Sequence, residues 1–242
     1  MWKTLIAAAA VTMAVSGPAS AVTVLGTGTG SLIGNDLTDL GNDGNENAYS
    51  DTNRAGFDAD FFSNVEPGFQ GGEFAFNVFD NQLGPGNAKF CCNFPGGNPV
   101  IIGAMFDSAF ELTSFTLSSA NDVPNRDPIV WQIEGSNNTT SGLDGDWDPI
   151  FVRNGTVSDW ASRLQVNHYA PENGDTFLTS EGFSAFRLVI SDTIAGTGGG
   201  ANVQVGELEL FGVAQVLLPP AILLLLGAVG MLGAMRRREV SV

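Results

Sequence analysis

Short apolar runs that alternate with turn residues mark the central part of the chain, from Glu73 to Gly212. In Phe115-Thr116-Leu117-Ser118 every second side chain is apolar, so one face of an extended strand can enter a core while the other meets solvent. This part of the sequence carries no sustained apolar stripe with helical spacing. The pattern predicts an all-β, antiparallel fold with strands near 74–76, 100–102, 112–117, 129–133, 186–190 and 203–211.

The first 21 residues have the order of a secretory signal peptide. A basic opening at Lys3 precedes an apolar run from Leu5 to Val15, and Ala19-Ser20-Ala21 offers small residues for cleavage. The apolar run is too short to span a bilayer as an uncleaved anchor. We expect cleavage after Ala21 and export of the remaining chain.

A longer apolar segment lies in the last part of the chain, residues 213–242. Twenty uncharged residues, 216–235, are followed by Arg236, Arg237 and Arg238. About 20 apolar residues are enough to cross a hydrocarbon layer of ~30 Å, and flanking arginines tend to stay in the cytoplasm. The sequence therefore predicts a C-terminal transmembrane helix that holds the preceding residues on the outer face of a membrane.

The same segment combines a proline motif, an apolar stretch and an arginine cluster, in that order. The motif reads Val216-Leu217-Leu218-Pro219 and is followed by Pro220. It resembles the PEP-CTERM sorting signals of Gram-negative bacteria in their Val-Pro-Leu-Pro-Ala variant, with Leu217 in place of the first proline and Pro220 in place of the alanine. The resemblance implies cleavage by an exosortase, a membrane-embedded cysteine protease, and delivery by the secretion machinery to the cell surface or extracellular matrix. A plain anchor that is never cut is the alternative.

Composition narrows the range of partners. The chain has a formal net charge of −16, 31 glycines and only 15% charged residues, which favours a loop-rich β protein over a helical bundle. Without the expected signal peptide and tail, 25 acidic and 6 basic residues remain, a net charge of −19. Such a body is repelled by phosphates, so we expect no nucleic acid partner.

Residues 22–72 are rich in Gly, Asn and Asp, especially across 30–37 and 42–47. These residue types favour turns and left-handed backbone conformations. The Asp-x-Asp-x-Asp-Gly order of an EF-hand, with its closing Glu, is absent. We expect solvated loops that lead into the following domain and can supply its first strands; a calcium-binding loop is the alternative.

A series of motifs spans residues 73–212. In order, they are Asn77-Val78-Phe79-Asp80-Asn81, Trp131-Gln132-Ile133-Glu134-Gly135-Ser136-Asn137, Trp147, Phe186-Arg187-Leu188 and Gly206-Glu207-Leu208-Glu209-Leu210-Phe211-Gly212. This order resembles the discoidin domain (coagulation-factor type C), a galactose-binding-like jelly roll. Asn81 stands where that family usually has Gly, and the disulfide that ties the ends of many animal members is missing. The resemblance implies an antiparallel β-sandwich that binds a ligand without catalysis. We expect Trp131 and Ile133 on one face of a strand, and Trp147 as a plug at one end of the barrel.

The resemblance also implies a metal site. In the galactose-binding-like family a calcium ion often joins the first loop to the last strand. Carried over to this sequence, its ligands would be Asp80, Asn87 and Glu207, with backbone carbonyls around Asn77 and Asn81. Oxygen ligands alone suit Ca²⁺ and not Zn²⁺. A hydrogen-bonded loop without a metal is the alternative.

Cys91 and Cys92 are the two cysteines of the chain. An exported protein meets an oxidising environment, and adjacent cysteines can form a disulfide with each other that rigidifies a tight turn. We predict this vicinal disulfide; two free thiols and pairing between molecules are the alternatives.

A sugar site needs a flat ring to stack on and a guanidinium to hydrogen-bond hydroxyl groups. The polar segment around residues 160–169, which we expect to be poor in strands, offers both. The candidate ligand-binding residues are Trp160, Arg163, His168 and Tyr169, with Arg126 at the rim of the jelly roll. Local packing is the alternative for the segment. For Arg126, the alternative is a loop ion-pair network with Asp127 that orients Trp131.

The sequence contains no motif that indicates catalysis. His168 is the sole histidine, no serine lies in a Gly-x-Ser-x-Gly motif, and no pair of carboxylates stands out for glycoside hydrolysis. The sequence thus predicts an exported, surface-sorted protein with a non-catalytic module for carbohydrate or another polymer. A structural surface component without a ligand and a secreted hydrolase are the alternatives.

Overall fold

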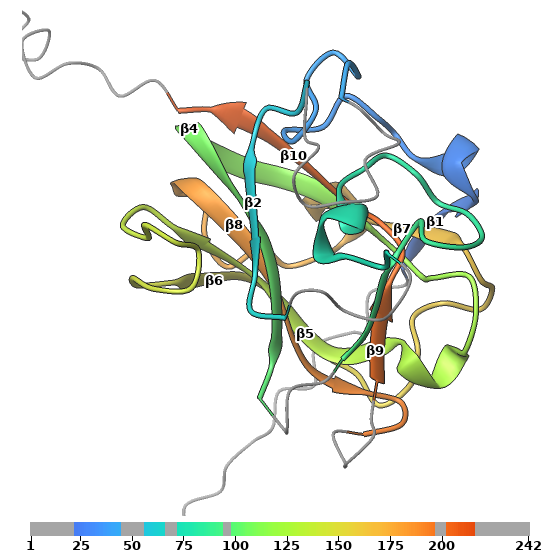
Figure 1. Ribbon diagram of the computed structural model, residues 1–242. Helices are drawn as coiled ribbons and strands as arrows, with labels where there is room; N and C mark the ends of the chain where they lie inside the picture. The colour runs from blue at the N-terminus through green and yellow to red at the C-terminus, as the bar shows by residue number, and fades with distance from the viewer. Residues whose placement is uncertain (1–21, 45–55, 66–71, 94–97, 197–201, 216–242) are drawn as a thin grey trace, which may run out of the picture.

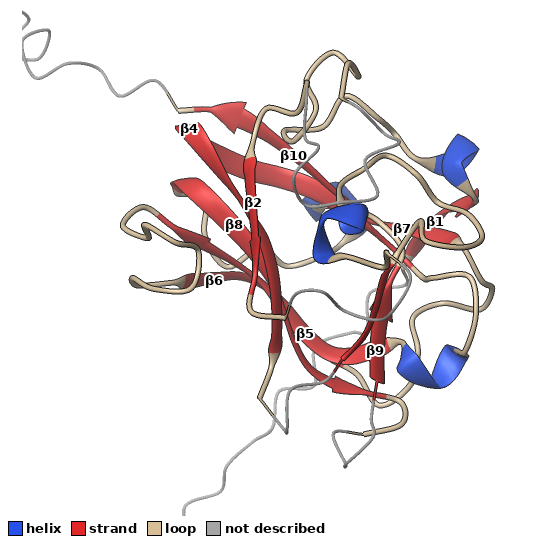
Figure 2. Cartoon of the chain, in the orientation of Figure 1, coloured by secondary structure: helices blue, strands red, loops and turns tan. Residues whose placement is uncertain are grey.

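The computed structural model describes residues 22–44, 56–65, 72–93, 98–196 and 202–215. These residues form antiparallel strands with a few short 3-10 helices between them, which confirms the all-β prediction (Figure 2). The strands are β1 Thr23–Thr27, β2 Asp60–Ser63, β3 Phe90–Asn93, β4 Val100–Ser118, β5 Pro128–Ser136, β6 Asp148–Asn154, β7 Gln165–Tyr169, β8 Gly182–Thr193, β9 Asn202–Val205 and β10 Leu208–Ala214. The 3-10 helices are η1 Thr29–Ser31, η2 Ala75–Val78, η3 Pro124–Arg126 and η4 Pro171–Asn173.

The predicted signal peptide (1–21) and the predicted transmembrane helix and sorting motif (216–242) lie outside the described residues. Within the part of the chain that is described, no helix has the length and apolar character to cross a bilayer.

Strand β4 organises the sheet. It is one strand of 19 residues, where the sequence pattern predicts separate strands at 100–102 and 112–117. Its first part, from Val100 to Met105, pairs with β8 and β2, and β8 continues to β5 and β6. Its second part, from Phe110 to Ser118, pairs with β10 and β7, and β7 continues to β1; Phe110 and Glu111 also pair with β8. Figure 1 shows these two groups of strands fanning out from β4.

An aromatic core joins the two groups. Phe115 of β4 stacks on Tyr169 of β7 with ring centroids 4.8 Å apart, and Trp131 of β5 stacks on Phe151 of β6 at 5.3 Å. The two pairs meet edge to face, since Phe115 lies 6.0 Å from Trp131. Because rings from both strand groups pack on one another, the arrangement is that of a sandwich whose layers share β4.

Two predicted strands differ in the structure. Residues 75–78 form the 3-10 helix η2, in which every side chain is buried, so the alternation in Phe74-Ala75-Phe76 does not reflect a strand. The predicted strand 203–211 divides at Gly206 into β9, which pairs with β3, and β10, which pairs with β4. A Cβ on Gly206 would lie 2.6 Å from the backbone oxygen of Ser119, so only glycine allows this close crossing.

The two tryptophans of the central motifs have different surroundings. Trp131 and Ile133 of β5 are both buried, as the alternation predicts. Trp147 is half-exposed on the loop before β6, so the prediction that it plugs one end of a barrel is wrong. The indole Nε1 of Trp147 donates to the backbone oxygen of Asp144 at 2.8 Å, which holds the ring at the surface.

Residues 22–72 contribute to the sheet through β1, which pairs with β7, and β2, which pairs with β4. Contrary to the expectation of solvated loops, the stretch 36–39 is buried. Its packing against β10 is described with the carboxylates below.

Candidate functional site

Two buried carboxylates meet where the first long loop touches the last strand. Asp80 follows η2 and Glu207 directly precedes β10, and each side chain is 1% exposed. The backbone N–H of Asn81 donates to Glu207 Oε1 at 3.1 Å, and the N–H of Gln82 donates to Asp80 Oδ1 at 3.0 Å. The structure thus brings together the two carboxylates that the resemblance singles out.

Burial and mutual repulsion perturb this pair. Loss of solvent raises the pKa of Glu207 well above its usual value, and the negative charges of Asp80 and Glu209 raise it further. Among the described residues, Glu207 Oε2 has no hydrogen-bond partner although it is buried. A buried oxygen without a donor is costly, and a cation beside it would remove that cost.

A hydrogen bond joins Asn77 to the backbone of Asn87 within this loop. The Asn77 side-chain amide donates to the backbone oxygens of Gly72 at 2.6 Å and Asn87 at 2.5 Å, so it fixes the loop's path. Asn77 Oδ1 is buried and has no hydrogen-bond partner in the described part of the chain. Carboxylate and amide oxygens are the kind of ligands that fit a hard cation such as Ca²⁺.

Asn81 has a left-handed backbone with φ of 59°. Among residues other than glycine, Asn adopts this conformation most readily, which explains physically how it can replace the usual Gly of the discoidin pattern. Its side-chain amide donates to Asp39 Oδ2 at 2.6 Å, a contact that glycine cannot make. The departure at Asn81 is therefore compatible with the loop and adds a tie to the N-terminal segment.

Three more carboxylates hold that N-terminal segment in place. Glu209 of β10 accepts the backbone N–H groups of Ile33 at 3.2 Å and Gly34 at 2.5 Å, and the hydroxyl of Thr116 at 2.6 Å. Asp36 accepts the N–H of Leu210 at 2.9 Å, and burial raises its pKa to about 7. Asp39 accepts the N–H groups of residues 43 and 44. These buried partners explain why the stretch is not a solvated loop.

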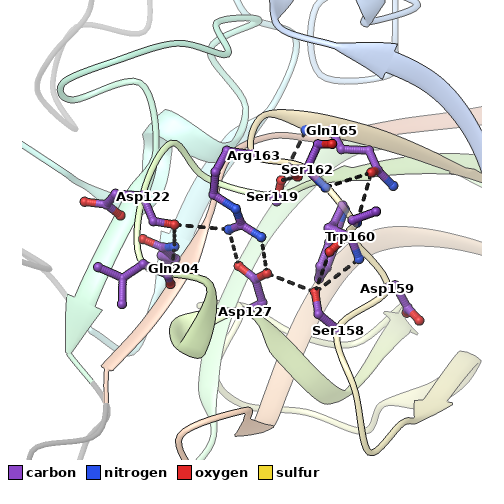
Figure 3. A network of polar contacts seen from close by, with 12 residues as sticks. Ser119, Asp122, Asp127, Ser158, Asp159, Trp160, Ser162, Arg163, Gln165 and Gln204 are labelled. Atoms are coloured by element: carbon purple, nitrogen blue, oxygen red, sulfur yellow. Dashed lines mark hydrogen bonds and ion pairs between the residues drawn. The ribbon is translucent and has the colours of Figure 1, made fainter.

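Trp160 and Arg163 belong to a polar network that Figure 3 shows in close-up. The Arg163 guanidinium donates to both oxygens of Asp127, with Nη1 to Oδ1 at 2.7 Å, and to the backbone oxygen of Asp122 at 3.2 Å. Ser158 donates its hydroxyl to Asp127 at 2.9 Å and accepts the backbone N–H of Trp160 at 3.1 Å. The network therefore ties the segment before β7 to the loop before β5.

The rings of the predicted sugar site lie in the interior. Trp160 is 5% exposed and donates its indole N–H to the backbone oxygen of Leu117 at 3.2 Å. Tyr169 is 1% exposed, and its burial raises the pKa of its phenol well above the usual value. A sugar ring cannot reach either ring face, so the structure does not join these two residues to a surface site. The segment also contains strand β7, which corrects the expectation that it is poor in strands.

The other predicted ligand-binding residues lie apart. His168 of β7 is half-buried, and its Nδ1 lies 3.2 Å from the side-chain nitrogen of Asn173. Arg126 ends η3 and places its Nη1 3.3 Å from the Sγ of Cys92. The expected loop ion-pair network exists for Asp127, which pairs with Arg163, but Arg126 makes its described side-chain contacts with the two sulfur atoms instead.

Cys91 and Cys92 lie on β3, both buried, and the structure joins them by a disulfide. Arg126 also donates to Cys91 Sγ at 3.6 Å. The carboxylate of Glu73 lies near both sulfur atoms, which makes this the one group of three potential metal-binding side chains among the described residues. Because the two sulfur atoms are bonded to each other, they are not thiolate ligands.

The sequence does not predict one contact at the surface, between Arg187 and Trp147. Arg187 of β8 lies over the ring of Trp147, 4.0 Å from its centroid, and donates Nε to Glu134 Oε2 at 2.5 Å. Both residues are part of the discoidin-like motifs, but local pattern does not reveal that they touch. A half-exposed ring beside a guanidinium is the combination that the sequence led us to expect in the segment around residue 160.

No family model matches this chain, and no curated protein matches it. Several solved structures resemble its fold. The CBM32-3 module of a family 31 glycoside hydrolase from Clostridium perfringens has 16% identity and a TM-score of 0.45, covering 63% of this chain and 91% of that chain. The family 32 module of C. perfringens NanJ, in complex with galactose, has 14% identity and a TM-score of 0.41, covering 63% and 90%. A chitosan-binding module from a Paenibacillus sp. IK-5 chitosanase/glucanase has 14% identity and a TM-score of 0.42, covering 64% and 96%. At these scores the likeness decides neither the family nor the ligand of this chain.

Proposed function

We propose that the chain is an exported, non-catalytic binding protein that recognises a carbohydrate or similar polymer at the cell surface or in the extracellular matrix. The order of the discoidin-like motifs across residues 73–212 and the antiparallel sandwich built from them support this proposal. The single observation that carries it is the meeting of Asp80 with Glu207. Local sequence pattern gives no reason for these two buried acids to be neighbours, whereas the discoidin-like motif order does.

Calcium is part of the proposal. Asp80, Glu207 and Asn87 would hold the ion together with backbone carbonyls of the same loop, and the buried Glu207 Oε2 without a donor supports this assignment. The ion supplies positive charge that neutralises the two carboxylates. The role of the ion would be structural, because it would join the loop of Asp80 to Glu207 at the start of β10. Its carboxylate ligands are buried and do not face a substrate.

Sorting completes the proposal. The N-terminal segment 1–21 would direct export, and the tail with Val216-Leu217-Leu218-Pro219 and Arg236-Arg237-Arg238 would insert in the inner membrane until an exosortase cuts it. Both segments have the composition and order that these steps require. Pulse-labelling in a host with and without the exosortase tests this part, because only cleavage releases a shorter protein from the membrane.

Calorimetry and melting curves of the full chain in a mild non-ionic detergent test the metal site. We expect saturable calcium uptake and a higher melting temperature, both lost in Asp80→Asn and Glu207→Gln. Asp107→Asn is the matched control, because Asp107 is exposed and lies outside the loop. Calcium uptake that survives both substitutions would refute the site.

A glycan array probed with the same protein tests the binding function. Binding to a defined set of glycans supports the proposal. Absence of binding to any glycan, in the presence of calcium, would favour a structural surface component instead.

A further inference from the structure

A groove of about 710 Å³ opens between the middle of β4 and the segment from η4 to the start of β8. Its apolar lining includes Phe177 and Leu178, and its polar lining includes Glu111, Glu172 and Glu181. The groove is separate from the Asp80–Glu207 pair and from the network of Arg163, neither of which contributes to its lining. Its volume lies in the range of pockets that take small ligands, about 300–1,000 Å³.

The wall formed by residues 177–181 is held firmly. The ring of Phe177 reaches the aromatic core, 5.9 Å from the ring centroids of both Phe115 and Phe151. The backbone N–H of Leu178 donates to the oxygen of Ile150 at 2.8 Å. This anchoring leaves the Leu178 side chain 56% exposed, so an apolar surface is presented to the groove by a rigid segment.

The three glutamates leave their charges unpaired within the described structure. Glu111, Glu172 and Glu181 make no side-chain hydrogen bond or ion pair with any described residue. They are also too far apart to share one metal ion, since the described residues offer a single group close enough for that, at Glu73 and the two cysteines. Separate carboxylates along a groove suit a ligand that carries several separate positive charges.

The chain supplies no counter-charge to the groove from its described residues. Each basic side chain of the described body is engaged elsewhere. The pairs are Lys89 with Glu73 and Asp122, Arg153 with Asp159, Arg163 with Asp127 and Arg187 with Glu134, while Arg126 lies against the sulfur atoms of Cys91 and Cys92. In a protein with a net charge of −16, such a groove repels anions and attracts cations.

We infer that this groove binds a polymer of amino sugars with free, protonated amines, an inference that rests on the proposed carbohydrate-binding function. The amines pair with Glu111, Glu172 and Glu181, while the apolar faces of the sugar rings lie against Leu178 and Phe177. A basic peptide has similar charge. The chain's own tail is a poor fit, because its apolar segment of twenty residues would form a helix ~30 Å long that a groove of this size cannot cover.

Binding of a short, fully deacetylated glucosamine oligomer to the full chain tests the inference. The triple variant Glu111→Gln/Glu172→Gln/Glu181→Gln removes the three groove charges. The matched control Asp60→Asn/Asp107→Asn/Asp148→Asn removes three exposed charges outside the groove. We expect the groove variant to lose affinity by about 10-fold, since exposed ion pairs contribute roughly 0.5 kcal/mol each. The control should lose much less, and about 1 M salt should abolish the difference.

Equal losses in the two triple variants would show general attraction to an acidic protein and would overturn the inference, as would an unchanged affinity in the groove variant. Tighter binding of a synthetic peptide of residues 232–242 than of the glucosamine oligomer would assign the groove to a peptide. Binding of the N-acetylated oligomer and of neutral glycans distinguishes the proposed carbohydrate-binding function from the inference that the groove binds amino sugars. Binding of neutral glycans that is unaffected by the groove substitutions, without binding of the deacetylated oligomer, leaves the proposed function standing and rejects this inference. Absence of binding to every glycan rejects both.

Discussion

The Cζ of Arg187 lies 4.0 Å from the centroid of the Trp147 ring. This contact joins strand β8 to the loop between β5 and β6, and the loop carries its own internal support. Asp144 accepts the hydroxyl of Thr140 at 2.7 Å and the backbone N–H groups of Thr140 and Ser141, each at 2.9 Å, and these hydrogen bonds lower the pKa of Asp144 far below its usual value. The Trp147 ring is therefore presented on the outer face of the sheet by a loop with a defined shape.

Substitution of Gly142 in this loop tests its packing, and Gly86, which lies in another loop and has the same φ angle, provides the control. Gly142 and Gly86 both have φ of 77°, but a Cβ on Gly142 would lie 2.1 Å from the ring of Phe62, whereas a Cβ on Gly86 meets no atom within 4 Å. Gly86→Ala should cost about 1–2 kcal/mol of unfolding free energy, from the left-handed backbone alone. Gly142→Ala should cost about 1–3 kcal/mol more, because the ring must move.

Denaturant unfolding of the two variants measures this difference, and Trp147 fluorescence reports on the loop. Equal costs would mean that the loop does not rest on Phe62.

Arg163 neutralises an aspartate that is buried completely, since the Asp127 side chain has no exposed surface. Arg163→Ala should therefore destabilise the protein by about 3 kcal/mol, because it leaves a buried charge without its partner. Adding Asp127→Asn to that variant should restore part of the loss. A double-mutant cycle by chemical denaturation measures the coupling, and a coupling near zero would contradict the pair's structural role.

Asp36 should make stability depend on pH in a defined window. Its folded pKa is about 7, above the ordinary pKa of 3.8 for an exposed aspartate, because burial favours the protonated form. Between these two values the folded state binds more protons than the unfolded state, so the contribution of Asp36 to stability falls as pH rises and is constant above about 7. The shift of roughly three units corresponds to at most ~4 kcal/mol.

Asp36→Asn should remove this slope. Unfolding free energies of both proteins across the window, in the presence of a chelator, give the measurement. Parallel pH profiles for the two proteins would show that Asp36 does not titrate there.

The Cys91–Cys92 bond predicts two outcomes in mass spectrometry. The unfolded protein without reductant should take up no alkylating reagent, and its mass should be that of a monomer. Reduction before alkylation should add two labels to each chain. Labelling without reductant would show free thiols, and a dimer mass would show pairing between molecules.

The sequence predicts well those strands whose own pattern of apolar and polar residues shows which side chains are buried. The alternation around Phe115 and Trp131 identifies β4 and β5 because Phe115 and Trp131 enter the aromatic core. The expectation that the other face of Phe115–Ser118 meets solvent is wrong, since Thr116 and Ser118 are buried too. β2, which reads Asp-Phe-Phe-Ser, has no such alternation and is a strand because β4 pairs with it. Residues 60–63 form a strand because they pair with residues of β4 about 40 positions further along the chain, and their own pattern does not predict this.

The residues of the candidate sites are likewise hard to predict where their partners lie far away in the sequence. A resemblance across the whole domain was needed to bring Asp80 next to Glu207. Asp36 reads as a solvated residue of a polar loop, yet its partner is the N–H of Leu210 at the far end of the chain. Trp160 and Tyr169 have the composition of a sugar site, but their polar neighbours serve to satisfy buried groups and not to face a ligand.

The sharing of β4 by both layers has a consequence for cooperativity. Val100–Met105 pairs with β2 and β8, and Phe110–Ser118 pairs with β7 and β10, while Phe110 and Glu111 also pair with β8, so neither layer can open without disturbing a strand that the other requires. The sandwich should therefore lack a half-open state of intermediate free energy. Amide hydrogens along both parts of β4 should exchange with solvent only through global unfolding, at one common free energy, while those of η4 exchange earlier through local fraying.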